Sequence, residues 1–240
     1  MSYLIRPQTV EPTPIGHAHP GGVRRPLTDL ASGPMERTAI GLHTYDTGGS
    51  AREDRHPDRE LAFYLLDGTM AARVAEKAFV AKAGDLVFIP RDTTYSFENA
   101  DAHALSFLHI AVALDHGAEN KASRRGAYHL RTSEIEPVLV GGTHMNMTSR
   151  QCIRPERVDT ERLALDISTY QPGGGNKPLA HPDAEQMYYV MAGTMRTYIA
   201  DQQYDGQPGD LLVIPRDTIH WHENATQGEI TYMLIGTILR

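Results

Sequence analysis

The sequence has almost no cysteine. Cys152 is the single thiol in 240 residues, so no disulfide bond can form within the chain, which favours a reducing compartment. The first residues lack the basic start and apolar run of a secretory signal. The sequence also lacks an apolar run approaching the roughly 18 residues of a transmembrane helix. We therefore expect a cytoplasmic protein and no membrane partner.

Basic residues are also scarce. Lys and Arg number 23 against 30 Asp and Glu, a net charge of −7, and they form no basic stripe. A nucleic-acid partner is therefore not expected. Long amphipathic helical patterns are absent as well. The length suffices for two domains of about 100–120 residues.

What the sequence does contain is an internal repeat. HPDRELAFYLLDGTM begins at His56 and HPDAEQMYYVMAGTM at His181, and 8 of their 15 positions are identical. GDLVFIPRDTTYSFENA begins at Gly84 and GDLLVIPRDTIHWHENA at Gly209, with 11 of 17 identical. Both pairs are offset by 125 residues. This constant offset indicates two copies of one structural unit.

Each copy has the pattern of short β-strands. Apolar-aromatic runs end at glycine or proline, and turn residues separate them. This pattern predicts an all-β fold with a sandwich or barrel in each half. We expect an N-terminal arm over residues 1–35, a first barrel over 36–115, connecting strands and linker over 116–150, and a second barrel over 151–240. His17 and His19 fall in a Pro- and Gly-rich part of the arm.

The repeated motifs carry a family resemblance. The series Gly209, Pro215, Asp217, His220 and Asn224 resembles the second signature of the cupin superfamily, and Gly173 to Gly193 resembles the first. Because the pair occurs in both halves, the chain resembles a bicupin, which implies two tandem antiparallel jelly-roll barrels. The resemblance does not specify a reaction, because one fold hosts many activities.

The resemblance implies a metal centre in the second half only. Cupin sites draw three histidines and a glutamate from the barrel interior, and the matching positions in the second half are Leu179, His181, Gln186 and His220. In the first half they are Asp54, His56, Leu61 and Tyr95. A first-row metal usually needs three protein donors. We predict a divalent Fe, Mn, Ni, Zn or Co ion held by His181, Gln186 and His220, and a degenerate first site.

Strand alternation indicates which of the remaining candidates point into the barrel, because side chains two residues apart share a face. If Gln186 points inward, Tyr188 does too, and Glu185 points outward. The spacing of His181 and Glu185 also fits a looser form of the motif, so Glu185 stays an alternative pocket residue. His222 shares a face with His220 and is a third ligand, a general acid or base, or a packed side chain. The candidate catalytic residues are thus His222, Tyr188 and Glu185.

A metal held by neutral ligands keeps its positive charge and favours an anionic, oxygen-rich substrate such as a hydroxy- or keto-acid. The resemblance implies a metal-dependent small-molecule enzyme, an oxidoreductase of the dioxygenase-like cleavage type first and an isomerase second. The alternative is a metal-free or non-catalytic ligand-binding bicupin. Bicupin ureidoglycine aminohydrolases fit less well, because the resemblance would require a Glu-x-His cluster in the second barrel and these positions read Leu179-Ala180-His181. Exposed barrel edges favour a homodimer.

Overall fold

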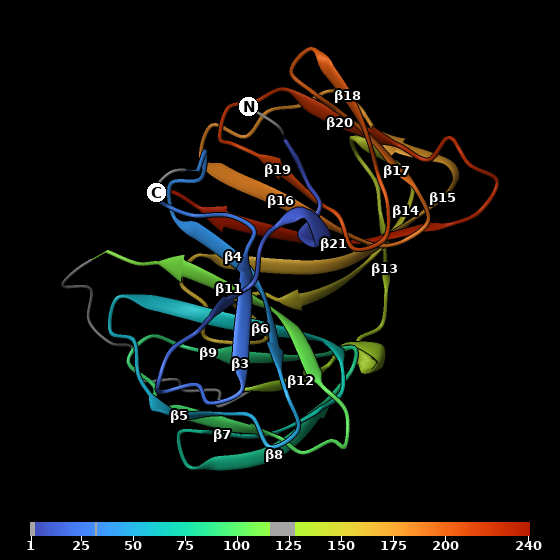
Figure 1. The fold of residues 1–240 in the computed structure, drawn as a ribbon. Helices are drawn as coiled ribbons and strands as arrows, with labels where there is room; N and C mark the ends of the chain where they lie inside the picture. The colour runs from blue at the N-terminus through green and yellow to red at the C-terminus, as the bar shows by residue number, and fades with distance from the viewer. Residues whose placement is uncertain (1–2, 32, 116–127) are drawn as a thin grey trace.

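The computed structural model describes residues 3–31, 33–115 and 128–240, which form β-strands and two 3-10 helices (Figure 1). The prediction of an all-β fold with two tandem barrels is confirmed. Within these ranges no helix has the length and apolar character needed to cross a membrane. Residues 116–127 of the predicted linker lie outside the described part of the chain.

The first barrel is built from two antiparallel sheets around one core. Its seven-stranded sheet has the order β12 (His129–Arg131), β9 (Asp85–Ile89), β6 (Arg59–Asp67), β11 (Leu105–Ala113), β4 (Thr38–Tyr45), β3 (Gly22–Pro26) and β2 (Thr13–Pro14). Its four-stranded sheet has the order β5 (Ser50–Asp54), β10 (Tyr95–Asn99), β7 (Thr69–Val74) and β8 (Lys77–Lys82).

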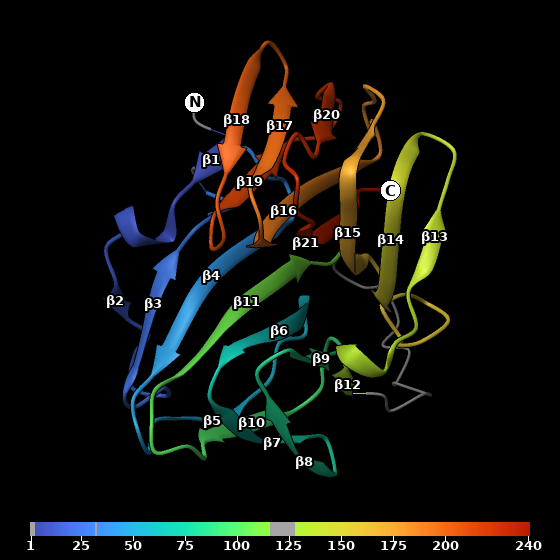
Figure 2. The same cartoon turned by 90° about the vertical axis from the view of Figure 1, so that its right-hand side faces the viewer.

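The second barrel is one curved ten-stranded sheet (Figure 2). Its main path is β1 (Leu4–Ile5), β19 (Leu211–Ile214), β16 (Ala184–Ala192), β21 (Ile230–Ile238), β15 (Leu163–Asn176), β20 (His220–Glu223), β17 (Met195–Ile199) and β18 (Gln202–Gly206). Beside β15 lie β14 (His144–Ile153) and then β13 (Val138–Val140). Gly175 lets β15 approach β20, because a Cβ there would meet the His222 carbonyl oxygen at 2.5 Å.

Alternation along the strands produces three hydrophobic cores. Leu61, Phe63 and Leu65 of β6 fill the first barrel, and Tyr188 and Val190 of β16 fill the second. The residues between them point the other way, and those of both barrels join in a shared core. The predicted inward direction of Tyr188 is therefore confirmed, and the same alternation holds along β6.

The N-terminal segment of each half crosses to the other barrel. Strand β1 pairs with β19, so residues from the predicted arm complete the second barrel, and β12 pairs with β9 to complete the first. The 3-10 helices η1 (Pro7–Thr9) and η2 (Thr132–Glu134) follow the two exchanged strands at the same offset of 125 residues. The described parts of the predicted arm and linker thus contribute strands to the two sheets.

This exchange has a sequence signal outside the two motif blocks. Residues 3–12 read YLIRPQTVEP and residues 128–137 read YHLRTSEIEP, identical at 4 of 10 positions and again 125 residues apart. The repeat therefore begins near Tyr3 and Tyr128, and each unit includes the strand that it gives to its neighbour.

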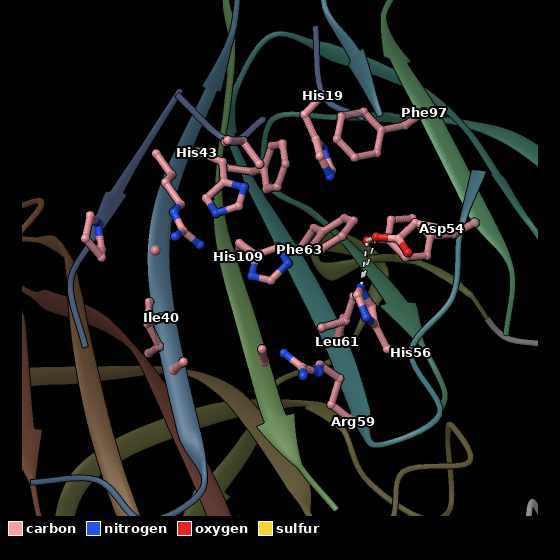
Figure 3. Close-up of a pocket in the computed structure, with 18 of the residues that line it drawn as sticks. His19, Ile40, His43, Asp54, His56, Arg59, Leu61, Phe63, Phe97 and His109 are labelled. Atoms are coloured by element: carbon pink, nitrogen blue, oxygen red, sulfur yellow. Dashed lines mark hydrogen bonds and ion pairs between the residues drawn. The ribbon is translucent and has the colours of Figure 1, made fainter. Parts of the chain in front are cut away.

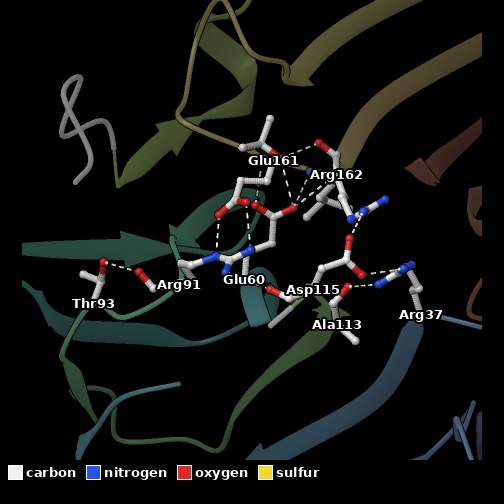
Figure 4. A network of polar contacts seen from close by, with 10 residues as sticks. Arg37, Glu60, Arg91, Thr93, Ala113, Asp115, Glu161 and Arg162 are labelled. Carbon is white, nitrogen blue, oxygen red and sulfur yellow. Dashed lines mark hydrogen bonds and ion pairs between the residues drawn. The ribbon is translucent and has the colours of Figure 1, made fainter. Parts of the chain in front are cut away.

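Two buried glutamates, Glu60 and Glu185, join the two barrels, and Figure 4 shows the network around Glu60. The Glu60 carboxylate accepts the backbone N–H groups of Glu161, Arg162 and Leu163 at 2.9, 3.0 and 2.7 Å. Arg91 forms a two-point ion pair with Glu161 beside it. Because Glu60 and Arg91 belong to the first barrel, these contacts tie it to the loop that opens β15.

The contact is repeated in the opposite direction. Glu185, the counterpart of Glu60, accepts the N–H groups of Glu36 and Arg37 at 2.7 and 3.1 Å. Arg216, the counterpart of Arg91, lies 3.4 Å from the Glu36 carboxylate. The two halves therefore hold one another by equivalent residues, which defines a reciprocal clasp.

Candidate functional site

Strand β20 carries two histidines into the second barrel. His220 and His222 are 1% and 2% exposed. Trp221 between them turns outward and stacks on Tyr198, with ring centroids 4.5 Å apart. The expectation that both histidines share a face is confirmed, and their ring centroids lie 5.7 Å apart.

Each of these imidazoles has one nitrogen fixed and one without a partner. His220 Nδ1 donates to the Thr218 carbonyl oxygen at 2.9 Å, and His222 Nδ1 lies 2.9 Å from the Thr197 hydroxyl. Among the described residues, neither Nε2 atom has a hydrogen-bond partner, although both are buried. Burial lowers the pKa of His220 to about 4 and also lowers that of His222. His220 therefore presents a neutral Nε2 lone pair to the barrel interior.

The other predicted site residues surround this pair. The half-buried His181 ring lies 5.6 Å from that of His220. Tyr188 packs against His222 at 4.3 Å between centroids, and its hydroxyl donates to Gln186 Oε1 at 2.7 Å. Burial raises the pKa of Tyr188, so this residue keeps its proton and orients the Gln186 amide.

Glu185 is not a pocket residue, contrary to one of the two alternatives. It is 1% exposed, and its carboxylate is occupied by the backbone of Glu36 and Arg37 between the barrels. The physical reason is strand alternation, since Glu185 points away from the face that carries Gln186 and Tyr188. Glu185 is therefore corrected from a catalytic candidate to a member of the reciprocal clasp.

His144 is a second-barrel residue that the motif analysis missed. Its Nδ1 lies 2.8 Å from the Tyr170 hydroxyl, and its pKa is lowered by burial and by nearby His181. His19 and Tyr45 make the same 2.8 Å contact in the first barrel. The recurrence of this pair 125 residues apart is the signal that would have found it.

The second-barrel histidines do not form a closed ligand set. Across the described ranges, no three His, Cys, Asp or Glu side chains lie close enough together to hold a metal ion. His181, His220 and His222 instead form a chain of rings with His220 in the middle. Gln186, bonded to Tyr188, provides an amide oxygen on the same inner face.

The first barrel, predicted to be degenerate, has a cavity of about 240 Å³ (Figure 3). Three of the four residues at the positions that match cupin metal ligands, Asp54, His56 and Tyr95, contact one another there. The Asp54 carboxylate lies 3.2 Å from His56 Nε2, and the Tyr95 hydroxyl lies 3.4 Å from both. The lining also includes His19, Arg24, His43 and His109, which lie outside the motif blocks, and Arg59 from the first block.

Comparison with known proteins agrees with this architecture. The sequence profile described as the cupin domain matches residues 41–111 and 166–236, more than half of the chain. A germin-like protein, subfamily 1 member 4, from Arabidopsis thaliana is 34% identical over 95 residues, covering 33% of this chain and 42% of that protein. Germin-like protein 5-1 from Oryza sativa subsp. japonica is 32% identical over 72 residues, 28% of this chain and 33% of that protein. The chain thus spans less than half of these relatives.

Solved structures match over the whole chain. Oxalate decarboxylase from Lactobacillus farciminis in complex with formate has a TM-score of 0.75 and 14% identity, covering 100% of this chain and 87% of that one. Oxalate decarboxylase from Bacillus subtilis, studied for its Mn(II) centres, has a TM-score of 0.73 and 14% identity, covering 99% and 77%. This similarity shows the fold. Together with the two matched domains, it shows that the chain belongs to the cupin family as a tandem cupin protein.

Proposed function

We propose that the protein is a metal-dependent enzyme that acts on a small, anionic, oxygen-rich molecule in its second barrel. One observation carries this proposal. Two buried imidazoles face the barrel interior with unpartnered Nε2 atoms, while a carbonyl oxygen and a hydroxyl group engage their Nδ1 atoms. Metal-binding histidines use this arrangement, in which a hydrogen bond at one ring nitrogen orients the other nitrogen toward the ion.

The donor chemistry of the second barrel fits a divalent transition metal. His220 and His222 would bind it through Nε2, with His181 and the Gln186 amide oxygen as the remaining candidates. When bound, such an ion supplies Lewis acidity that polarises a coordinated oxygen. Since these donors are all neutral, they leave the charge of the ion to be balanced by the substrate, which favours a carboxylate.

The chain's own residues supply the rest of the site. Tyr188 holds the Gln186 amide in place, and the Thr197 hydroxyl positions the His222 ring. The half-buried His181 is the most accessible of the three imidazoles and is the candidate for contact with an entering substrate or for proton transfer.

The comparisons support the substrate class. The structural neighbours are named for oxalate, a small dicarboxylate, and one of them holds formate. We propose cleavage of a carbon–carbon bond next to a carboxylate as the reaction to assay first, and isomerisation second. At 14–15% identity the reaction of those neighbours does not transfer to this chain.

The metal-free ligand-binding alternative also has a specific observation in its favour. Within the described residues the metal-binding side chains are not assembled into a site, whereas the first barrel contains an open cavity. Measurement of the metal content separates the two functions.

The test is elemental analysis of protein purified without a chelator, as wild type, His220→Ala and the exposed control His103→Ala. The proposal predicts one divalent ion per chain in the wild type and the control and its loss in His220→Ala. Binding of a keto-acid should then require metal. Wild-type protein without metal after supplementation, or full occupancy in His220→Ala, would overturn the proposal and favour the metal-free alternative.

A further inference from the structure

We propose that the cavity of the first barrel is a separate, metal-independent binding site for a small flat carboxylate, such as an aromatic or conjugated acid. This goes beyond the proposed function, which concerns the second barrel. The cavity opens along the inner face of β3, β4, β11 and β6 (Figure 3). Its size, wall chemistry and charge each point to this ligand class.

The size fits one small ring with its substituents. The cavity measures about 240 Å³. A cavity of about 150 Å³ holds benzene in another protein, and a water molecule occupies roughly 30 Å³. The first-barrel cavity therefore has room for a benzene ring and a carboxylate, but not for a nucleotide or a sugar chain.

Flat rings form one wall. His43 and His109 are stacked with centroids 4.4 Å apart and an angle of 8° between their planes. Phe63 continues the series, 5.1 Å from His109 at 30°. Figure 3 shows these three side chains in a row along the cavity. A planar apolar group binds such a wall by offset or edge contacts between rings.

The charge in the cavity favours an anion. Burial lowers the pKa of His43 to about 2 and that of His109 to about 3, so both rings are neutral. The cations are Arg24 and Arg59, and Figure 3 shows Arg59 reaching toward the cavity below His109. Arg59 is paired with Asp58, whereas the exposed Arg24, at the rim of the cavity, forms no ion pair with a described carboxylate.

Asp54 is the single carboxylate among the lining residues, and it is already engaged. His56 and Tyr95 both lie within hydrogen-bond or ion-pair distance of it. These three side chains form a polar end that suits a hydroxyl or second polar substituent. The Arg24 guanidinium is the group that would bind the ligand carboxylate, because its two N–H donors can form two parallel hydrogen bonds to it.

The internal repeat shows that the fold does not require this lining. At the positions of Arg24, His43 and His109, the second barrel has Ser149, Ser168 and Leu234. The framework contacts are nevertheless retained, since Tyr45 and Tyr170 occupy equivalent buried positions, as do Asn99 and Asn224. His43 is buried, and its ring forms no hydrogen bond with a described residue. Its nitrogens are not among the fully buried polar atoms that lack a partner, so they remain accessible to a ligand from the cavity that His43 lines.

The test is calorimetric titration of benzoate into protein freed of metal with EDTA. The wild type should bind saturably, and Arg24→Gln should bind at least about tenfold more weakly, because a charge-assisted contact is lost. Arg73→Gln removes the same charge from another exposed position of the same barrel, one that does not line this cavity, and should bind like the wild type. Cyclohexanecarboxylate, which has the same charge but is not flat, should bind more weakly than benzoate.

A second variant tests the cavity independently of charge. Ala39 lines the cavity from β4, and Ala39→Leu should abolish benzoate binding while the melting temperature stays near that of the wild type. Binding by His220→Ala should equal that of the wild type, so failure of the second-barrel proposal would leave this one standing. An absence of saturable binding by the wild type, or equal affinities of Arg24→Gln and Arg73→Gln, would refute the site.

Discussion

The reciprocal clasp makes a quantitative prediction about stability. Glu60→Gln keeps the shape of the side chain but replaces one carboxylate oxygen by an NH2 group. Glu60 Oε2 accepts the Glu161 N–H, and Oε1 accepts those of Arg162 and Leu163 and the Thr160 hydroxyl. The less costly amide orientation places NH2 at the Oε2 position. The Glu161 N–H then faces a donor and loses its acceptor.

The expected loss follows from these contacts. A buried N–H without an acceptor costs about 1–3 kcal/mol, and the two remaining backbone bonds each lose about 1 kcal/mol of charge assistance. Because a neutral amide is less costly to bury than a carboxylate, part of this is offset and the net loss is about 3 kcal/mol. For a chain of this size, that lowers Tm by about 6–12 °C.

The assay is thermal unfolding followed by circular dichroism at pH 7. Glu185→Gln provides an internal comparison, because Glu185 accepts two backbone N–H groups where Glu60 accepts three, so its decrease in Tm should be smaller. Glu98→Gln, at an exposed position of β10, should leave Tm unchanged. If Glu60→Gln melted like Glu98→Gln, the clasp would not hold the barrels together and the reasoning would be refuted.

Two further predictions concern pH and the exchanged strand. Burial raises the pKa of Asp166 from 3.8 to about 6, so its contribution to stability is present below pH 4 and lost as pH rises to 6, by about 3 kcal/mol at most. Asp166→Asn should flatten the Tm profile in that window, and parallel profiles would contradict this. Removal of residues 1–5 should speed hydrogen exchange at the Val213 amide, which bonds to the Tyr3 carbonyl oxygen. The equivalent Phe88 amide, bonded to Tyr128, should keep its protection, and equal exchange at both amides would show that β1 contributes nothing local.

The two barrels differ at the positions that face their interiors. The second barrel has Gln186, His220 and His222 where the first has Leu61, Tyr95 and Phe97. The first has Arg24, His43 and His109 where the second has serine or leucine. A duplicated framework thus presents two chemically different interiors. The enzyme and binding proposals therefore concern different halves and can be tested separately.

The sequence predicted the architecture and the shared faces of the candidate site residues on two strands. Both follow from local patterns, namely the offset of 125 residues and the two-residue alternation that places Gln186, Tyr188, His220 and His222 on inner faces. The same alternation identified Glu185 as the outward member of its pair, although the looser motif spacing kept it among the catalytic candidates.

Only the tertiary structure decided which segments meet. Glu185 contacts residues 148 and 149 positions away, and β1 joins a strand of the other barrel, so no local pattern identifies these partners. The first-barrel cavity likewise draws on Arg24, His43 and His109 from three strands outside the two motif blocks. Local periodicity fixes which face a side chain takes, but the groups that share a cavity are set by long-range strand pairing, which brings distant residues together only in the folded chain.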